Sequence, residues 1–185
     1  MTGNFSENRL AFLEGEVMLL TLSGGLSTRD RGSKVYREGL DDDRKNTIRK
    51  AIREKLASLV AGYTTPCPEK AHVQNIQKFA DDLTHDFGQD LHNGRFRIGV
   101  SQKLLNLYLK YQWLLEWIPE PCHCPFDSII IKQLSLPNRI NWTALDKVEA
   151  YWALVEAARK LSAAAGLSIA EWELAHFERM RDGSS

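Results

Sequence analysis

The feature that most constrains the fold is a nearly uninterrupted apolar segment at residues 104–118, followed by Pro119 and Pro121. The segment is shorter than the roughly 18 apolar residues that identify a membrane span. Four polar residues also interrupt it, namely Asn106, Lys110, Gln112 and Glu116. Because proline cannot continue a helix, the two prolines set its end. The sequence therefore predicts a buried core helix over about residues 101–117.

The composition is that of an ordinary globular domain. Of the 185 residues, 43% are hydrophobic and 26% are charged, which is typical of a folded chain and not of a disordered one. The length lies within the usual range for one domain, and no internal repeat or linker divides the chain. We therefore expect a single domain over residues 1–185, with a mobile glycine-rich loop at 22–34 and a tail at 183–185.

Helical periodicity recurs along the chain. Apolar residues at helical spacing predict helices over about 7–20, from about 41 to 61, and over 73–91. The β-branched residues are too scattered to alternate as strands. The predicted fold class is all-α, a single compact orthogonal helical domain of about six or seven helices.

Short local signals predict where these helices begin and end. Asp41–Asp43 and the pair Ser168 and Glu171 are typical of helix starts, and Asn93-Gly94 indicates a tight turn. Thr143 with Asp146 predicts another cap, and a short helix is expected near residues 126–134. The expected core consists of the residues on the densest apolar stripes: Phe79, Leu83, Leu105, Leu109, Leu114, Ile130, Val148, Trp152 and Val155.

Charge and cysteine content narrow the expected partners and compartment. Lys plus Arg and Asp plus Glu each number 24, so the zero net charge argues against strong non-specific binding of polyanions. The basic residues at 44–53 are flanked by Asp41–Asp43 and by Glu54, which favours a solvated helix face. An odd number of cysteines and a polar start without a signal-peptide pattern predict a cytoplasmic protein. We expect no membrane partner and no cofactor.

Cys122-His123-Cys124 raises the question of a metal site. Structural zinc sites usually place paired cysteines two to four residues apart, so that both thiolates reach one ion. The single intervening residue here is unfavourable, and the other histidines are dispersed along the chain. The sequence predicts no metal and leaves these thiols as packed or half-exposed groups.

Two charged residues flank the apolar helix and are candidates for chemistry. Lys103 is expected in its first turn, where the helix dipole disfavours a second positive charge and so favours a nucleophilic amine. Asp127 follows Pro125 at the start of the next expected helix, where a carboxylate is stabilised. Each also has a structural interpretation. Lys103, Asn106 and Lys110 lie at helical spacing and are most simply a solvated stripe, and Asp127 is most simply a helix cap.

Residues 99–134 resemble the helix-hairpin-helix DNA glycosylases, in particular the 8-oxoguanine branch. In that family a Gly-Val-Gly-x-Lys hairpin opens a helix with the catalytic lysine, and Pro-x-Asp supplies the catalytic aspartate. The matching residues are Gly99, Val100 and Lys103, then Pro125 and Asp127. Ser101 stands where the family has its second glycine, and the residues before Gly99 look like a turn instead of a helix.

The resemblance implies catalytic roles for Lys103 and Asp127. It also implies a DNA-phosphate contact through the hairpin at Gly99 and Ser101, to which Arg95 and Arg97 could contribute. The protein would then be a DNA-associated helical protein that removes a damaged base from duplex DNA. The alternatives are a non-catalytic helical module that binds another protein, and a nucleic-acid binder without chemistry. Whether the chain is an enzyme stays open at the level of sequence.

Overall fold

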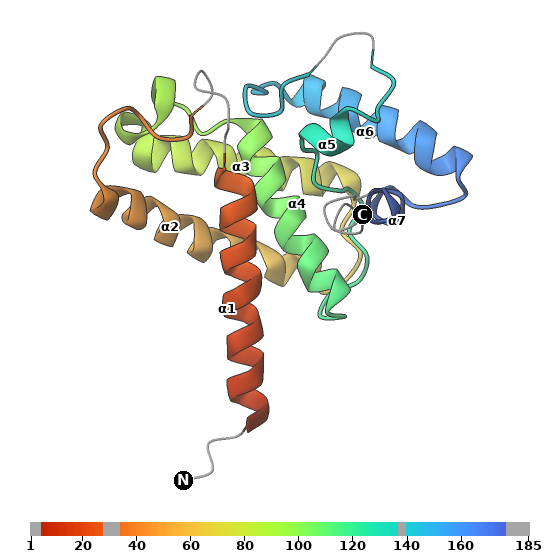
Figure 1. The fold of residues 1–185 in the computed structure, drawn as a ribbon, viewed down its shortest axis with the longest axis horizontal. Helices are drawn as coiled ribbons and strands as arrows, with labels where there is room; N and C mark the ends of the chain where they lie inside the picture. The colour runs from red at the N-terminus through yellow and green to blue at the C-terminus, as the bar shows by residue number, and fades with distance from the viewer. Residues whose placement is uncertain (1–4, 28–33, 137–139, 177–185) are drawn as a thin grey trace, which may run out of the picture.

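The computed structural model describes residues 5–27, 34–136 and 140–176, and most of these residues are helical (Figure 1). The all-α prediction is confirmed, since the only pairing of extended backbone in the described residues is an isolated bridge between Tyr36 and Leu91. Seven α-helices are present in the described ranges: α1 Phe5–Leu26, α2 Asp42–Val60, α3 Glu69–Phe87, α4 Ile98–Leu114, α5 Ser128–Ile131, α6 Val148–Ala164 and α7 Ile169–Ala175.

Helix α4 lies at the centre of the fold, as its apolar sequence predicts. It contacts α1, α2, α3 and α6, and only Tyr111, Trp113 and Leu114 of its residues are not buried. The helix begins at Ile98, three residues before the expected start. Among the described residues, no helix combines the length and the hydropathy that a membrane crossing requires.

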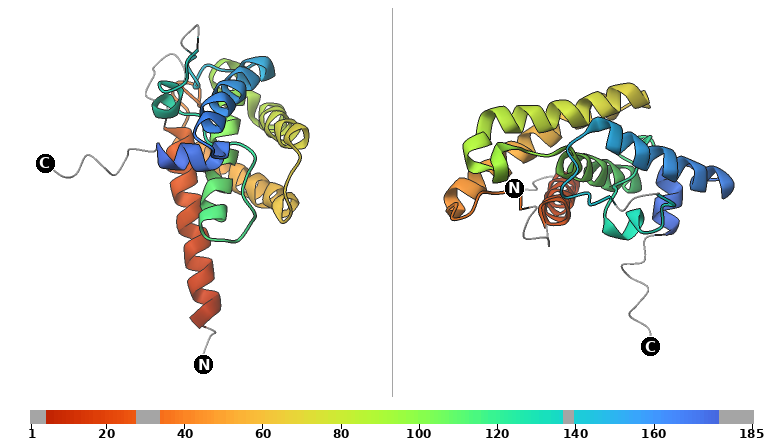
Figure 2. Two further views of the ribbon diagram at one scale, coloured as in Figure 1. Left: turned by 90° about the vertical axis from the view of Figure 1, so that its right-hand side faces the viewer. Right: turned by 90° about the horizontal axis from the view of Figure 1, so that it is seen from above.

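The other helices cover α4 from different directions (Figures 1 and 2). Helices α2 and α3 pack against each other on one side, where Ile48, Ile52 and Leu56 of α2 have no exposed surface. Helices α6 and α7 pack against each other on the opposite side. The segment between α4 and α6 carries the one-turn helix α5, and its end contacts the start of α4 through Leu145 and Asp146.

The first residues of the predicted loop at 22–34 are helical instead, at positions 22–26. Helix α1 continues through Gly24 and Gly25 to Leu26. A Cβ atom at Gly24 would approach Leu107 Cδ2 to 2.6 Å, and one at Gly25 would approach Leu104 Cδ2 to 2.4 Å. The two glycines therefore serve a close helix–helix contact, and sequence alone does not distinguish this role from that of a turn. Residues 28–33 of the predicted loop, and the predicted tail at 183–185, lie outside the described residues.

The predicted helix ends are confirmed at some positions and wrong at one. Asp41 caps α2 and Ser168 forms a capping box with Glu171 at α7, while Asn93 and Gly94 adopt positive φ in the expected turn. Thr143 and Asp146 do not cap α6, whose N-cap is Lys147. Asp146 instead accepts a hydrogen bond from the amide of Ile98, a residue 48 positions away in sequence, at 3.1 Å.

Most of the predicted core is confirmed. Phe79, Leu83, Leu105, Leu109, Ile130 and Val155 are buried in one apolar cluster. Val148 and Trp152 are half-buried and pack against this cluster. The prediction that Leu114 is buried is wrong, since 45% of its surface is exposed. Helix α4 ends at this residue and emerges there from the surrounding helices.

We expect Leu109→Ala to lower the free energy of unfolding by about 2–5 kcal/mol, since it removes a fully buried side chain from the central helix and leaves a cavity. Urea denaturation of the two proteins measures this difference. Leu114→Ala is the matched control on the same helix, and its exposed side chain predicts a change of about 0.5 kcal/mol or less. Equal losses in both variants would contradict the central position of α4.

Candidate functional site

A stripe of polar side chains on α4 is buried inside the protein. Lys103, Asn106 and Lys110 are exposed by only 6%, 0% and 5%, so the interpretation of these residues as a solvated face is wrong. Helical spacing places them on one face of α4, but the segments that cover this face come from distant parts of the chain. Each buried polar group therefore requires a partner from those segments.

Lys103 meets Asp127 and Trp142 on this face. The Lys103 Nζ atom lies 3.3 Å from Asp127 Oδ2, and both side chains are almost fully buried. The same ammonium lies 4.4 Å from the centroid of the Trp142 ring, a distance at which cation and ring attract each other. The two residues that sequence singled out for chemistry are thus in direct contact, and an aromatic face that sequence did not single out covers the amine.

Asp127 has two roles at once. Its Oδ1 atom accepts hydrogen bonds from the amides of Ile129 and Ile130 at the start of α5, which confirms the predicted cap. Its second oxygen, Oδ2, is the one that faces Lys103. The cap fixes the direction of the carboxylate, so that the oxygen left over points at the amine.

Two amide side chains of α4 hold the segment that carries Asp127. Gln102 donates to the carbonyl oxygen of Phe126 at 2.8 Å and accepts from the Phe126 amide at 3.2 Å. One turn further along, Asn106 donates to the carbonyl oxygen of Cys124 at 2.9 Å. These bonds run between α4 and extended backbone, and they explain how a residue 24 positions from Lys103 reaches it.

A pocket of about 1000 Å³ opens beside the Lys103–Asp127 pair. Both residues line it, together with Trp142. The remaining walls come from the end of α1, from Tyr111 of α4, from the α5 region and from the segment before α6, including Leu20, Ser23, Ser27, Ile131, Lys132 and Asn141. This volume is at the upper end of the range for small-molecule sites, and the charged pair places an ammonium group and a carboxylate in its wall.

The start of α4 differs from the expected phosphate-binding hairpin. The amide of Ile98 donates to Asp146, and the amide of Gly99 donates to the carbonyl oxygen of Leu145 at 2.8 Å. Ser101 is fully buried and donates its hydroxyl to the carbonyl oxygen of Ile76. Gly99 and Ser101 therefore have structural partners in place of the phosphate contacts that the resemblance implies.

The two arginines before α4 are also engaged within the protein. Arg95 forms ion pairs with Asp81 at 2.6 Å and with Asp146 at 3.0 Å. Arg97 is not an exposed residue, since only 8% of its surface is accessible, and its guanidinium donates to the carbonyl oxygen of Lys34. Both side chains anchor the entry to α4.

Gly99 permits the contact that brings Trp142 to the site. A Cβ atom at this position would lie 1.7 Å from the carbonyl oxygen of Trp142, a distance that no side chain tolerates.

The helix-dipole argument for a nucleophilic Lys103 does not apply in the structure. Because α4 begins at Ile98, Lys103 lies in the second turn of the helix and not in the first. What surrounds the Lys103 amine is the Asp127 carboxylate and the Trp142 ring.

A second buried ion pair lies further along the same stripe. Lys110 Nζ is 2.6 Å from Glu173 Oε2 of α7, and neither side chain is more than 7% exposed. Burial raises the pKa of Glu173, and the charge of Lys110 opposes this rise. Neither residue lines the pocket, so this pair joins α4 to α7. No sequence signal distinguishes Glu173 from the other acidic residues near the C-terminus.

Comparison of the chain with known protein families, curated proteins and solved structures finds no match. The resemblance to glycosylases therefore rests on the motif residues within 99–134 alone.

We expect Lys110→Met to lower the free energy of unfolding by about 3–5 kcal/mol, because it leaves the Glu173 carboxylate buried without its cation. The double variant Lys110→Met/Glu173→Leu should recover most of that loss, since it removes the second charge as well. Urea denaturation of both variants and of Glu173→Leu completes the double-mutant cycle. A Lys110→Met variant within 1 kcal/mol of the parent would contradict a buried pair.

Proposed function

We propose that the pocket beside Lys103 and Asp127 is the active site of a DNA-processing enzyme in which the Lys103 amine attacks a sugar carbon. The observation that carries the proposal is the contact between an amine and a carboxylate in the wall of a nucleotide-sized pocket. The resemblance of residues 99–134 to glycosylases supports it, because the same two residues carry the matching motif.

The chemistry needs a nucleophile and a proton acceptor in contact. Lys103 Nζ adds to the anomeric carbon of a damaged nucleotide, the bond between sugar and base breaks, and the departing base keeps the electron pair and gains a proton. Asp127, 3.3 Å away, takes a proton from the attacking amine. Opening of the sugar ring then gives a Schiff base, which water hydrolyses. With an abasic sugar, the amine adds to the free aldehyde and water leaves.

The pocket supplies contacts suited to a nucleotide. Trp142 offers an aromatic face, which stacks on bases irrespective of their sequence. Lys132 lines the pocket with an exposed side chain, so it is the cation best placed to meet a phosphate. The phosphate contact would therefore come from the pocket lining and not from the start of α4, which differs from the glycosylase pattern.

Borohydride trapping on duplex DNA with an abasic site tests the proposal, because reduction converts the Schiff base into a stable covalent complex. We expect trapping by the parent chain and its loss in Lys103→Gln. Lys50→Gln is the matched control, because it removes an equal charge from an exposed lysine that does not line the pocket. Trapping that persists in Lys103→Gln, or that falls equally in both variants, would contradict the role of Lys103 as the nucleophile.

Asp127→Asn separates the catalytic role of Asp127 from its capping role. Asparagine caps a helix about as well as aspartate does, and circular dichroism checks that the variant is folded despite the loss of the carboxylate from the buried pair. The rate of trapping should nevertheless fall by about 100-fold or more, the usual contribution of a general base. A rate within about twofold of the parent would leave Asp127 as a cap and ion-pair partner alone.

The alternative function is a helical module that binds another protein, and one observation favours it. Helix α1 projects away from the rest of the fold toward its N-terminal end (Figures 1 and 2). Four large apolar side chains on this helix are exposed: Leu10, Phe12, Leu19 and Leu20. Such residues mark an interaction surface when they lie together. If the protein traps no DNA, the exposed apolar residues of α1 are the better guide to its function.

A further inference from the structure

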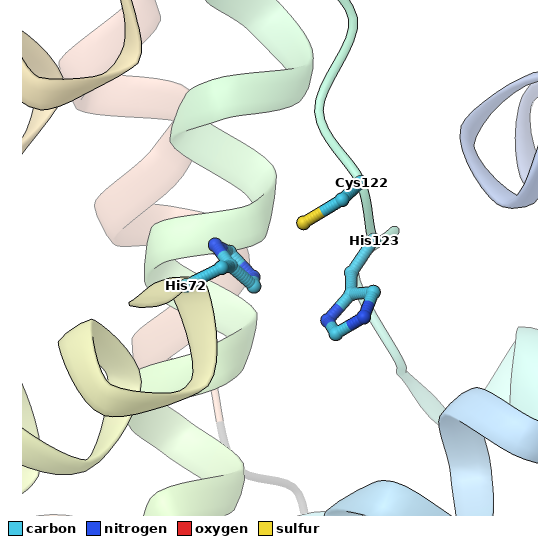
Figure 3. Close-up of side chains that lie close together, drawn as sticks. All are labelled: His72, Cys122 and His123. Carbon is cyan, nitrogen blue, oxygen red and sulfur yellow. The ribbon is translucent and has the colours of Figure 1, made fainter. Parts of the chain in front are cut away.

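Three side chains with metal-binding atoms meet on the side of α4 where α3 begins. His72 belongs to α3, and Cys122 and His123 belong to the segment after α4; we call these three residues the His/Cys cluster. One possible ligand atom from each residue lies within 4.8 Å of the other two. The side chains converge on a common space from the two segments (Figure 3). None of the three lines the pocket at Lys103.

His72 is oriented within the cluster by its neighbours. The residue has no exposed surface, and its Nδ1 atom lies 2.8 Å from the Tyr63 hydroxyl. Its Nε2 atom makes no close hydrogen bond and interacts with the Asn106 side chain. A histidine held at one ring nitrogen, with the other nitrogen directed at the ion, is the usual arrangement of a metal ligand.

The second histidine of the cluster is also oriented by its neighbours. His123 contacts Glu69 Oε1 at 3.0 Å and the Tyr151 hydroxyl at 2.8 Å. Carboxylate and hydroxyl groups are typical partners of the histidine nitrogen that does not bind the ion.

We propose that His72, Cys122 and His123 bind one Zn²⁺ ion. Two imidazoles and one thiolate form a ligand set that zinc prefers, and three protein ligands leave a fourth position for water. The spacing argument against zinc assumed that Cys122 and Cys124 would act together. The fold instead pairs Cys122 with its neighbour His123 and with His72, a residue 50 positions earlier in the chain.

Zinc binding has two costs at this site. Burial raises the pKa of Cys122 to about 12, so the ion must displace a proton from the thiol, as zinc does at its cysteine ligands. His123 must exchange one of its two hydrogen bonds for a metal bond. Cys122 itself is half-exposed, which gives the ion a route from solvent to the cluster.

Titration of the chelator-treated full chain with Zn²⁺, in competition with a chromophoric chelator, tests the proposal. We expect one ion per chain, a higher melting temperature with zinc, and, with Co²⁺ as probe, the absorption band of a thiolate-bound cobalt. Cys122→Ala should weaken zinc binding by more than about 100-fold, since it removes a ligand itself and not one of its supports. Cys124→Ala removes a buried thiol outside the cluster and should leave zinc binding unchanged.

Two results would overturn the proposal. One is a folded chain that binds neither Zn²⁺ nor Co²⁺; the Nε2 atom of His72 would then serve only its interaction with the Asn106 side chain. The other is zinc binding that survives Cys122→Ala without a thiolate band in the cobalt spectrum. Loss of binding in both cysteine variants, with folding intact by circular dichroism, would also reject the assignment.

Discussion

The structure depends on how the polar stripe of α4 is satisfied. A helix surrounded by other elements loses access to water on nearly all sides, yet α4 carries Lys103, Asn106 and Lys110 on one face. Buried charges and amides are tolerated only with partners. The carboxylates of Asp127 and Glu173 supply partners for the two lysines, and the backbone near Cys124 supplies one for the amide. The C-terminal half of the chain is thereby fixed against the central helix.

The same requirement shapes the pocket. The first amides of α4 are satisfied by Asp146 and by the carbonyl oxygen of Leu145, which draws the segment before α6 onto the helix start. Gly99 allows the backbone of Trp142 to follow it closely, and the ring then covers the Lys103 amine. The segment that occupies the first amides of α4, where the resemblance implied a phosphate contact, is thus also the segment that places Trp142 over the Lys103 amine.

The tertiary contacts also explain why particular residues were predicted well or badly. Phe79 and Leu109 lie on dense apolar stripes, and any packing of such helices buries them. Gly24 and Gly25 look like a loop in sequence because glycine is unfavourable in a helix. They are helical here because α1 and α4 approach closely at that point. Local propensity was outweighed by a contact between residues about 80 positions apart.

The sequence by itself determined the all-α class, the central position of the apolar segment, the cap at Asp127 and the identity of the two residues that meet at the pocket. These features follow from periodicity, from local hydrogen bonding and from a short motif, all of which act over a few residues. Only the tertiary structure decided that Lys103 is buried, that Trp142 covers it and that His72 joins Cys122 and His123. The reason is physical: burial and pairing of polar groups depend on which distant segment covers a helix face, and periodicity within that helix carries no information about its cover.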